Sequence, residues 1–107
     1  MNTEYINRVE LQGIIGSVRK YNVGGRNGFQ LTLATNRTYK DRDGNVIIET
    51  QWSCCSGWEG EGVDTSLLEK GQTVHLTGRL RSQRYTAADG EERSSTEVLV
   101  HSLGPAV

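Results

Sequence analysis

Several features that mark other protein classes are missing from this sequence of 107 residues. No apolar run is long enough to span a membrane, and the polar first ten residues carry no secretory pattern. The only two cysteines, Cys54 and Cys55, are neighbours. Adjacent strand residues point to opposite faces, so these thiols are poorly placed to share a metal or to form a disulfide. We therefore expect a reduced, cytoplasmic location without a metal or a membrane partner.

The groups that an enzyme active site requires are also missing. We find no nucleophile beside a general base, no metal-ligand spacing and no glycine-rich phosphate loop. His75 and His101 are single histidines on expected strands, and we interpret both as structural or solvent-facing. The sequence therefore predicts no catalytic residues and no cofactor.

The formal net charge is only −1, although nucleic-acid-binding domains are usually basic. The charges are unevenly distributed along the chain. Acidic residues gather between positions 59 and 69, whereas cations gather at 37–42 and at 79–84. A near-neutral total can therefore conceal a basic face.

Alternation of apolar and polar residues predicts β-strands. The pattern is clearest at 74–81, where Val74, Leu76, Gly78 and Leu80 fall on one face. Similar patterns predict strands at 7–18, 29–35, 46–55 and 96–101. A short helix is expected at 64–71, with an N-cap at its start and Gly71 at its end. Glycines within the first strand are expected where a sheet bends or closes into a barrel.

Two hairpin tips and one loop connect these strands. Asp-Gly turns are expected at 43–44 and 89–90, and the glycine-rich segment 22–28 reads as a flexible loop. The first tip spans 36–45, and the second is a long, mobile tip between the strands at 74–81 and 96–101. We expect the face of the last hairpin that is opposite to the core to carry Arg79, Arg81, Arg84 and Tyr85.

The order strand, strand, strand, short helix, strand, strand predicts an all-β protein. No segment between strands is long enough for crossover helices, which disfavours a parallel sheet. A five-stranded Greek-key barrel, with one short helix between strands 3 and 4, also limits exposed sheet edges. This is the OB-fold, whose strand face and loops bind oligonucleotides or oligosaccharides. We expect residues 1–107 to form one such domain.

The chain resembles the bacterial single-stranded DNA-binding proteins over nearly its whole length. The matching segments are NRVELQG at 7–13, LAT at 33–35, ETQW at 49–52, LEKGQTVHLTGRLR at 68–81, DG at 89–90 and TEVLV at 96–100. Each segment alone is a weak signal, but their order and spacing together are specific.

The resemblance implies four base-stacking aromatic residues. Trp52 matches a stacking tryptophan of the family, and Trp58 falls where the family usually has phenylalanine. Tyr39 and Tyr85 lie near the hairpin tips, where the family usually has tryptophan. All four keep the flat π surface that stacking requires. The residues alone leave open whether Trp52 packs in the core and whether Trp58 anchors a loop.

Cations beside these rings are expected to follow the phosphate backbone and release counterions. The candidates are Arg8, Arg19, Lys20, Arg37, Lys40, Arg42, Arg79, Arg81, Arg84 and Arg93. The alternative interpretation is a solvated strand face that happens to be rich in arginine.

The resemblance also implies assembly, because the family forms dimers of dimers. We expect a homotetramer, with a dimer as the fallback. The apolar residues that exceed what one small barrel is expected to enclose are Ile14, Ile15, Ile47, Ile48 and Leu99. Family members usually continue into a flexible region whose acidic tip recruits repair enzymes. This sequence ends at Val107, so we expect a tail-less member that lacks such recruitment.

The expected function is sequence-independent binding and protection of single-stranded DNA during replication, recombination or repair, at the nucleoid. The alternative is an OB-fold adaptor of the replication or primosome type that acts mainly through protein–protein contacts. The four aromatic residues favour the DNA-binding interpretation.

Overall fold

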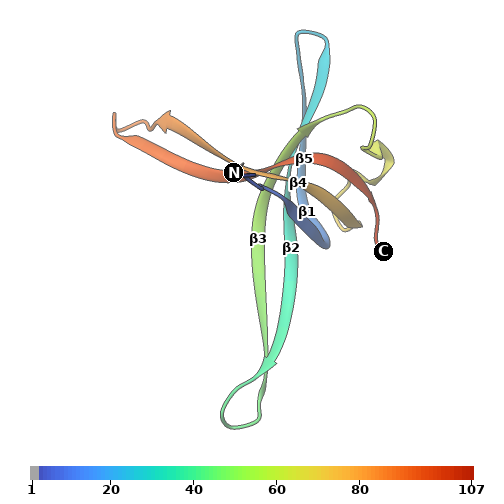
Figure 1. The fold of residues 1–107 in the computed structure, drawn as a ribbon, viewed down its shortest axis with the longest axis vertical. Coiled ribbons are helices and arrows are strands. Elements are labelled where there is room, and N and C mark those ends of the chain that lie inside the picture. Colours follow the sequence, from blue (N-terminus) through green and yellow to red (C-terminus); the bar gives the residue numbers. More distant parts are fainter. Residues whose placement is uncertain (1–2) are drawn as a thin grey trace.

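The computed structural model describes residues 3–107 and shows a closed five-stranded barrel. The strands are β1 (Val9–Val23), β2 (Arg26–Lys40), β3 (Val46–Trp58), β4 (Thr73–Thr86) and β5 (Glu92–Pro105). Their order around the barrel is β1-β2-β3-β5-β4 (Figure 1). The predicted all-β, five-stranded barrel is therefore confirmed.

The five seams of the barrel differ in length and direction. Four of them are antiparallel, and the longest runs join β2 to β3 and β4 to β5. The seam between β3 and β5 is parallel, and its register comprises only Cys55 opposite Val98 and Ser56 opposite Leu99. The barrel therefore closes through one short seam.

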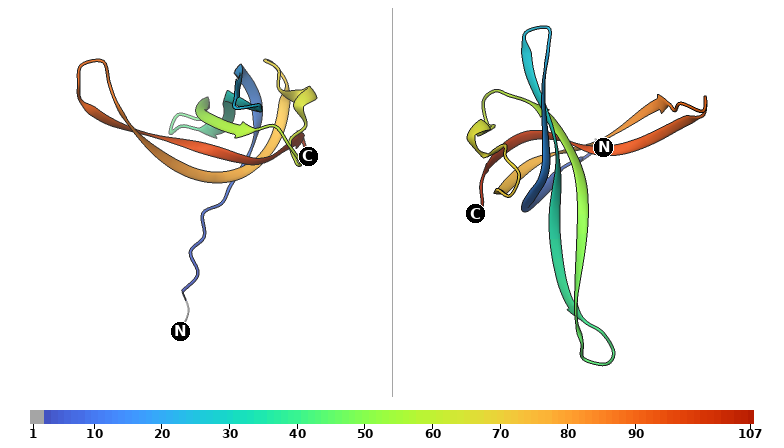
Figure 2. Two further views of the ribbon diagram at one scale, coloured as in Figure 1. Left: turned by 90° about the horizontal axis from the view of Figure 1, so that it is seen from above. Right: turned by 180° about the vertical axis from the view of Figure 1, so that it is seen from behind.

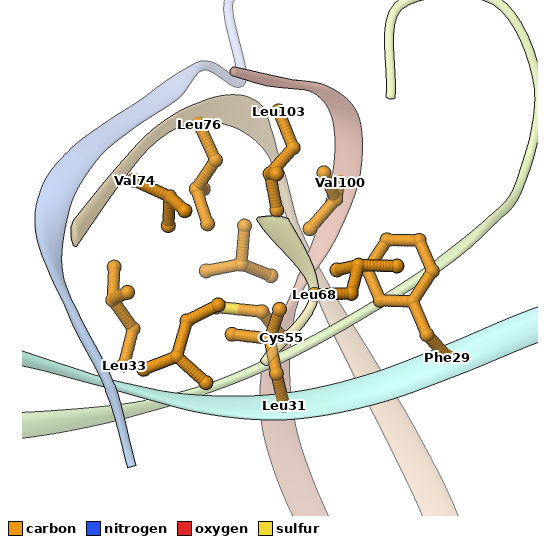
Figure 3. Packing of buried hydrophobic residues seen from close by; sticks show 11 residues of the cluster. Phe29, Leu31, Leu33, Cys55, Leu68, Val74, Leu76, Val100 and Leu103 are labelled. Atoms are coloured by element: carbon orange, nitrogen blue, oxygen red, sulfur yellow. The ribbon is translucent and has the colours of Figure 1, made fainter. Parts of the chain in front are cut away.

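Alternating side chains from all five strands fill the barrel interior (Figure 3). The buried apolar side chains are Ile15, Phe29, Leu31, Leu33, Cys55, Leu68, Val74, Leu76, Val98, Val100 and Leu103. Leu68 comes from the segment between β3 and β4, and it adds to the core that the strands build. Burial of these side chains supplies the main stabilising term of so small a domain.

Three hairpin arms project from the barrel in different directions (Figures 1 and 2). They are the ends of β1–β2, β2–β3 and β4–β5. The predictions of a loop at 22–28 and of a tip at 36–45 were too long, because β1 and β2 continue to a turn at Gly24 and Gly25 and β2 continues to Lys40. The tip of the last hairpin is likewise only residues 87–91. Cross-strand backbone bonds hold these arms even where side chains do not alternate in burial.

The Asp-Gly turns are present at the tips of two arms. Gly44 has φ 81° and Gly90 has φ 84°, the left-handed region that favours glycine. Asp41 supports the first tip, since its Oδ1 accepts hydrogen bonds from the backbone N–H of Asp43 and Asn45, each at 2.9 Å. These bonds lower the pKa of the Asp41 carboxyl, with the bond from Asn45 as the largest cause.

The helix predicted at 64–71 is only a 3₁₀ turn, Thr65–Leu67. Asp64 caps it as expected, because its Oδ1 accepts a 3.1 Å bond from the Ser66 N–H. The segment ends early because Leu68 is drawn into the core and the Gly71 N–H donates to the Ile15 carbonyl. No helix within residues 3–107 is long and apolar enough to cross a membrane.

Two glycines of β1 allow close approaches that a side chain would block. A Cβ at Gly13 would collide with the carbonyl oxygen of Ala34, and a Cβ at Gly16 would collide with the ring of Trp52. The β1–β2 register shifts between Ile15 and Ser17, at Gly16. Glycines of the first strand therefore lie where the barrel bends and closes, as predicted.

Candidate nucleic-acid interface

The outer face of β3 presents both tryptophans. The barrel interior takes Cys55, so the alternation of the strand turns Trp52, Cys54 and Trp58 to the opposite, outer face. The two tryptophans are six positions apart on the strand, which corresponds to about 20 Å. One strand therefore carries two flat rings along one surface.

Trp52 is not a core residue, because 56% of it is exposed. Its ring lies across Gly16 of β1 and next to Thr32 of β2, where a larger residue than glycine would displace it. The interpretation of Trp52 as a core side chain is therefore wrong. One side of the ring packs against Gly16 and the other side is open to solvent, which suits stacking against a base.

Trp58 is partly buried and has two neighbours that sequence reasoning missed. The guanidinium carbon of Arg26 lies 4.4 Å from the ring centroid, in cation–π contact. Tyr21 meets the ring edge-on, with centroids 5.9 Å apart and planes at 76°. Gly28 allows this packing, since a Cβ there would collide with the Tyr21 ring. Alternation along β1 places Tyr21 on the face of Arg19, and this signal could have identified it.

A groove of about 330 Å³ opens on the same outer face. Its polar side chains include Arg19 of β1, Gln30 and Thr32 of β2, Cys54 of β3 and Glu97 of β5. Cys54 lies between the two tryptophans on β3, two positions after Trp52. The groove therefore lies along the surface that connects the two rings, and its volume falls within the range of ligand sites.

Arg81 reaches this region but is already paired. Its Nη2 and Nε both donate to Glu97 Oε1, at 2.5 Å and 3.1 Å, and Nη2 also lies 3.5 Å from Ser56 Oγ. Only 13% of the Glu97 side chain is exposed. Sequence reasoning named Arg81 but missed Glu97, although the two residues are direct cross-strand partners.

Tyr39 and Tyr85 lie on separate arms, away from the barrel face. Tyr39 pairs with Ile47 across the β2–β3 arm, and the Arg37 guanidinium carbon lies 5.7 Å from its ring centroid. Tyr85 pairs with Arg93, whose Nη2 donates to Asp89 at 2.8 Å. The structure therefore groups Trp52 with Trp58 and leaves each tyrosine on its own arm.

The expectation that Arg84 shares a face with Tyr85 is wrong. The two are neighbours on one continuous strand, and their cross-strand partners are Ser94 and Arg93 respectively. Adjacent strand residues point to opposite faces, so Arg84 lies on the face of Leu80, while Tyr85 lies on the face of Arg79 and Arg81.

The other predicted cations are spread over the surface. Arg19 lines the groove, whereas Lys20, its neighbour on β1, points to the other face of that strand. Arg79 pairs with Leu99, next to the short seam. The remaining exposed candidates, at the start of the chain and on the β2–β3 arm, are Arg8, Lys40 and Arg42.

The two cysteines face opposite sides, as predicted. Cys54 is exposed in the groove and Cys55 is buried in the core. Burial, followed by the nearby Cys54 and Glu97, raises the pKa of the Cys55 thiol to about 12. Within residues 3–107 no three histidine, cysteine or acidic side chains are grouped so that they could hold a metal ion.

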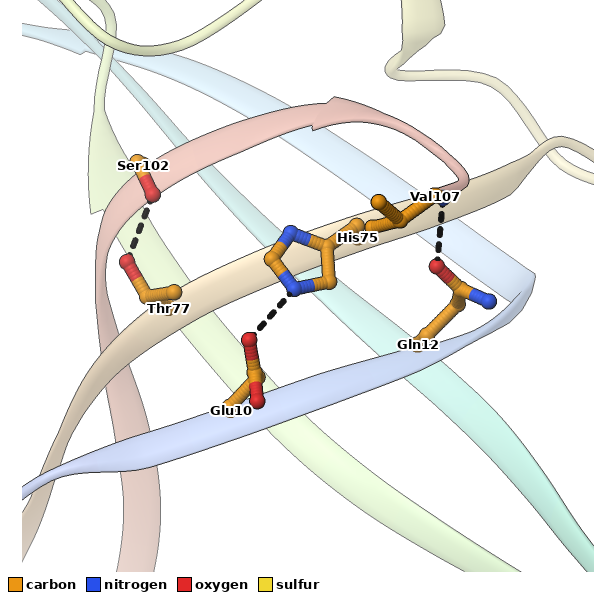
Figure 4. A network of polar contacts seen from close by, with 6 residues as sticks. All are labelled: Glu10, Gln12, His75, Thr77, Ser102 and Val107. Atoms are coloured by element: carbon orange, nitrogen blue, oxygen red, sulfur yellow. Dashed lines mark hydrogen bonds and ion pairs between the residues drawn. The ribbon is translucent and has the colours of Figure 1, made fainter.

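A different part of the barrel surface carries a polar network that contains no tryptophan, tyrosine or phenylalanine (Figure 4). His75 Nε2 lies 2.8 Å from Glu10 Oε2, and Thr77 shares a hydrogen bond with Ser102. Gln12 Oε1 accepts a 2.7 Å bond from the backbone N–H of Val107. This network ties β1 to β4 and β5, so His75 has the structural role that the sequence suggested.

Comparison with known proteins gives one consistent family. The model of the single-strand binding protein family matches residues 6–105. A single-stranded DNA-binding protein of Xanthomonas axonopodis pv. citri is 36% identical over 102 residues, covering 92% of this chain and 56% of the relative. The protein of that name from Xylella fastidiosa is 34% identical over 102 residues, covering 92% and 62%. The chain therefore spans somewhat more than half the length of these curated relatives.

Solved structures share the fold. The SSB of Plasmodium falciparum in complex with ssDNA superposes with a TM-score of 0.74 at 23% identity, covering 97% of this chain and 96% of that chain. A deletion mutant of the single-stranded DNA binding protein from Thermus aquaticus gives a TM-score of 0.72 at 25% identity, covering 95% and 51%. The fold therefore recurs in proteins of low sequence identity to this chain.

Proposed function

Because the chain belongs to the single-strand binding protein family, we propose that it binds single-stranded DNA along the outer face of β3. One observation carries the proposal: Trp52 and Trp58 lie on the same face, on either side of a groove that Arg19 lines. Family membership also makes the chain a binding protein and not an enzyme.

Stacking is the first part of the mechanism. Trp52 offers an open ring face, and a base stacked on an aromatic ring contributes about 1–3 kcal/mol. One face of Trp58 is covered by Arg26, whose planar guanidinium can itself stack on a base or move to a phosphate. Tyr39 and Tyr85 would add stacking contacts where the strand passes along the arms.

Charge is the second part. Arg19 and Arg26 lie next to the groove and to Trp58, where a strand would run, while Arg37 lies beside Tyr39 on its arm. Each cation that neutralises a phosphate releases counterions, so binding would weaken as salt rises. Ring faces and phosphates are common to all bases, so most of this affinity would be independent of sequence.

The proposed physiological role is to cover and protect single strands during replication, recombination or repair, in the bacterial cytoplasm at the nucleoid. Relatives named single-stranded DNA-binding proteins support this role. An OB-fold adaptor that acts through protein contacts is the second candidate, because Val46 and Ile48 form an exposed apolar stripe on the β2–β3 arm.

We also propose a homotetramer, with a dimer as the fallback. Ile14 is 47% exposed and Ile48 is 67% exposed, so apolar strand surface remains uncovered in one chain. Ile15 does not contribute to this surface, contrary to expectation, because it is a core residue with 1% exposure. Light scattering coupled to size exclusion tests the assembly, since a mass of one 11.8 kDa chain at micromolar concentration would contradict it.

Titration with oligo-dT tests DNA binding. Intrinsic tryptophan emission should fall as the oligonucleotide is added at low salt, because a stacked base quenches an indole. Trp52→Phe and Trp58→Phe variants assign the signal to one ring each while they keep a π surface. Unchanged emission together with no shift in a gel would overturn DNA binding and leave the adaptor function. A matched oligo-U strand measures the preference for DNA over RNA.

A further inference from the structure

Glu97 is an acidic side chain inside a surface that otherwise suits nucleic acid. It projects from β5 into the groove, which it shares with Arg19, Gln30 and Cys54. With 13% of its side chain exposed, it belongs to the wall of the groove and not to its solvated rim. A carboxylate at this place must affect which part of a DNA strand can enter.

The two oxygens of this carboxylate differ. Both hydrogen bonds from Arg81 go to Oε1, at 2.5 Å and 3.1 Å. Among the hydrogen bonds of residues 3–107, Oε2 receives none, and it is not fully buried. Arg81 therefore fixes the position of the carboxylate, while one oxygen keeps its capacity to accept a hydrogen bond from a ligand.

The free oxygen selects among the parts of a nucleotide. A phosphate is an anion and would be repelled by a carboxylate in the wall of the groove. The part of the groove beside Glu97 therefore suits a base. Cytosine, adenine and guanine each carry an exocyclic amino group, which is a donor that a carboxylate accepts. Thymine has no amino group, and its one ring donor, N3–H, lies between O4 and O2, two acceptors that a carboxylate disfavours.

We infer that the groove beside Glu97 reads one base edge and prefers bases with an exocyclic amino group over thymine. The inference rests on the proposed function and adds one base-selective position to binding that is otherwise independent of sequence. Arg81 acts in it as a positioning residue, because its two bonds orient Glu97. A hydrogen bond to a charged group gives an expected effect of about tenfold in affinity.

The experiment compares strands that differ in one group. Short homopolymers of about eight nucleotides place the same base in the groove in every binding register. Oligo-dC is compared with a strand of the same length in which every cytosine is replaced by pyrimidin-2-one, which lacks only the 4-amino group. The wild-type protein should bind oligo-dC about tenfold more tightly than the pyrimidin-2-one strand. Equal affinity for the two strands would overturn the inference, whereas failure of both strands and of oligo-dT to bind would overturn the proposed function instead.

Glu97→Gln provides the test from the protein side. Glutamine keeps an oxygen for Arg81 and places an amide N–H₂ donor where Oε2 accepted, so the advantage of oligo-dC should disappear. Glu61→Gln, an exposed carboxylate in the loop after β3, is the control and should keep the wild-type ratio. Circular dichroism and urea unfolding check that both variants are folded. An unchanged ratio in folded Glu97→Gln would also contradict the assignment.

Discussion

The barrel and its arms use β-strands in different ways. In the barrel each strand has one face in the core, where Leu33 and Leu76 are completely buried. In the arms the same strands continue with both faces in water, and Ile48 is 67% exposed. The barrel is therefore stabilised by apolar burial, whereas the arms depend on hydrogen bonds between only two strands.

This difference separates a fixed part of the candidate interface from an adjustable part. Trp52 rests on Gly16 and Trp58 is braced by Tyr21, so both rings are held before any ligand arrives. The tyrosines lie on two-stranded arms, which we expect to sample more conformations than the barrel does, so binding would have to order them. We expect the barrel to supply affinity and the arms to adapt to the path of the strand.

The largest effect is expected in the core. Leu33→Ala should lower the free energy of unfolding by about 2–5 kcal/mol, because it leaves a cavity in the closed barrel. Glu49→Ala, at an exposed position of the β2–β3 arm, should change it by no more than about 0.5 kcal/mol. Urea unfolding followed by circular dichroism measures both. A similar loss for the two variants would show that the arms contribute to the cooperative core.

The next largest effect is expected on DNA affinity, where a ring on the barrel, Trp52, is compared with a ring on an arm, Tyr85. Trp52→Ala should weaken binding of single-stranded DNA by about 1–3 kcal/mol while the domain stays folded. Tyr85→Ala should cost less, since ordering its arm offsets part of the stacking energy. Gel-shift or anisotropy titrations at one salt concentration give the two values. If Tyr85→Ala costs as much as Trp52→Ala, the arm is as well ordered as the barrel.

A smaller effect is expected for Arg26, which covers one face of Trp58. Arg26→Ala should reduce the slope of log affinity against log salt by about 0.7, the value for one phosphate contact on a single strand. Lys70→Ala, which removes an exposed cation beyond the 3₁₀ turn, should leave the slope unchanged. An unaltered slope for Arg26→Ala would mean that this guanidinium only packs on the indole.

The smallest effect on binding is expected at the cysteines. Cys54→Ser should change DNA affinity by less than about 0.5 kcal/mol. A maleimide at pH 8 should label only Cys54 in the folded protein, since Cys55 is buried and its pKa is raised to about 12. Mass spectrometry counts the adducts, and two adducts in the folded state would contradict the buried position.

The raised pKa of Cys55 also makes the free energy of unfolding depend on pH. The thiol has its usual pKa of 9.0 in the unfolded chain and a pKa of about 12 in the folded protein. This contribution to stability is complete below pH 9 and is lost as the pH rises from 9 to 12. Cys55→Ala should therefore show a shallower fall in unfolding free energy over that interval than the wild-type chain does.

Sequence reasoning identified the barrel because alternation and burial coincide there. The pattern at 74–81 predicted β4, and the alternation in the first and second strands predicted β1 and β2. It failed on the arms, where polar residues occupy both faces and no periodicity reports the strand. Alternation could place Tyr21 on the face of Arg19, but the contacts of Tyr21 and Arg26 with Trp58 were beyond reach. They depend on the pairing of β2 with both β1 and β3. Glu97 was missed because its partner lies across a hairpin, sixteen positions away.

The short seam between β3 and β5 is the part of the barrel with the fewest paired residues, and we expect it to be the least stable. Only Cys55 with Val98 and Ser56 with Leu99 join the two strands there, whereas the other seams have longer registers. Local opening of a barrel is expected to begin where the fewest backbone hydrogen bonds join two neighbouring strands. Glu97 and Cys54 lie next to this seam. A DNA strand bound in the groove would therefore span the seam and oppose its opening. Hydrogen exchange at the amides of 55–56 and 98–99 should then slow on DNA binding more than exchange anywhere else in the barrel.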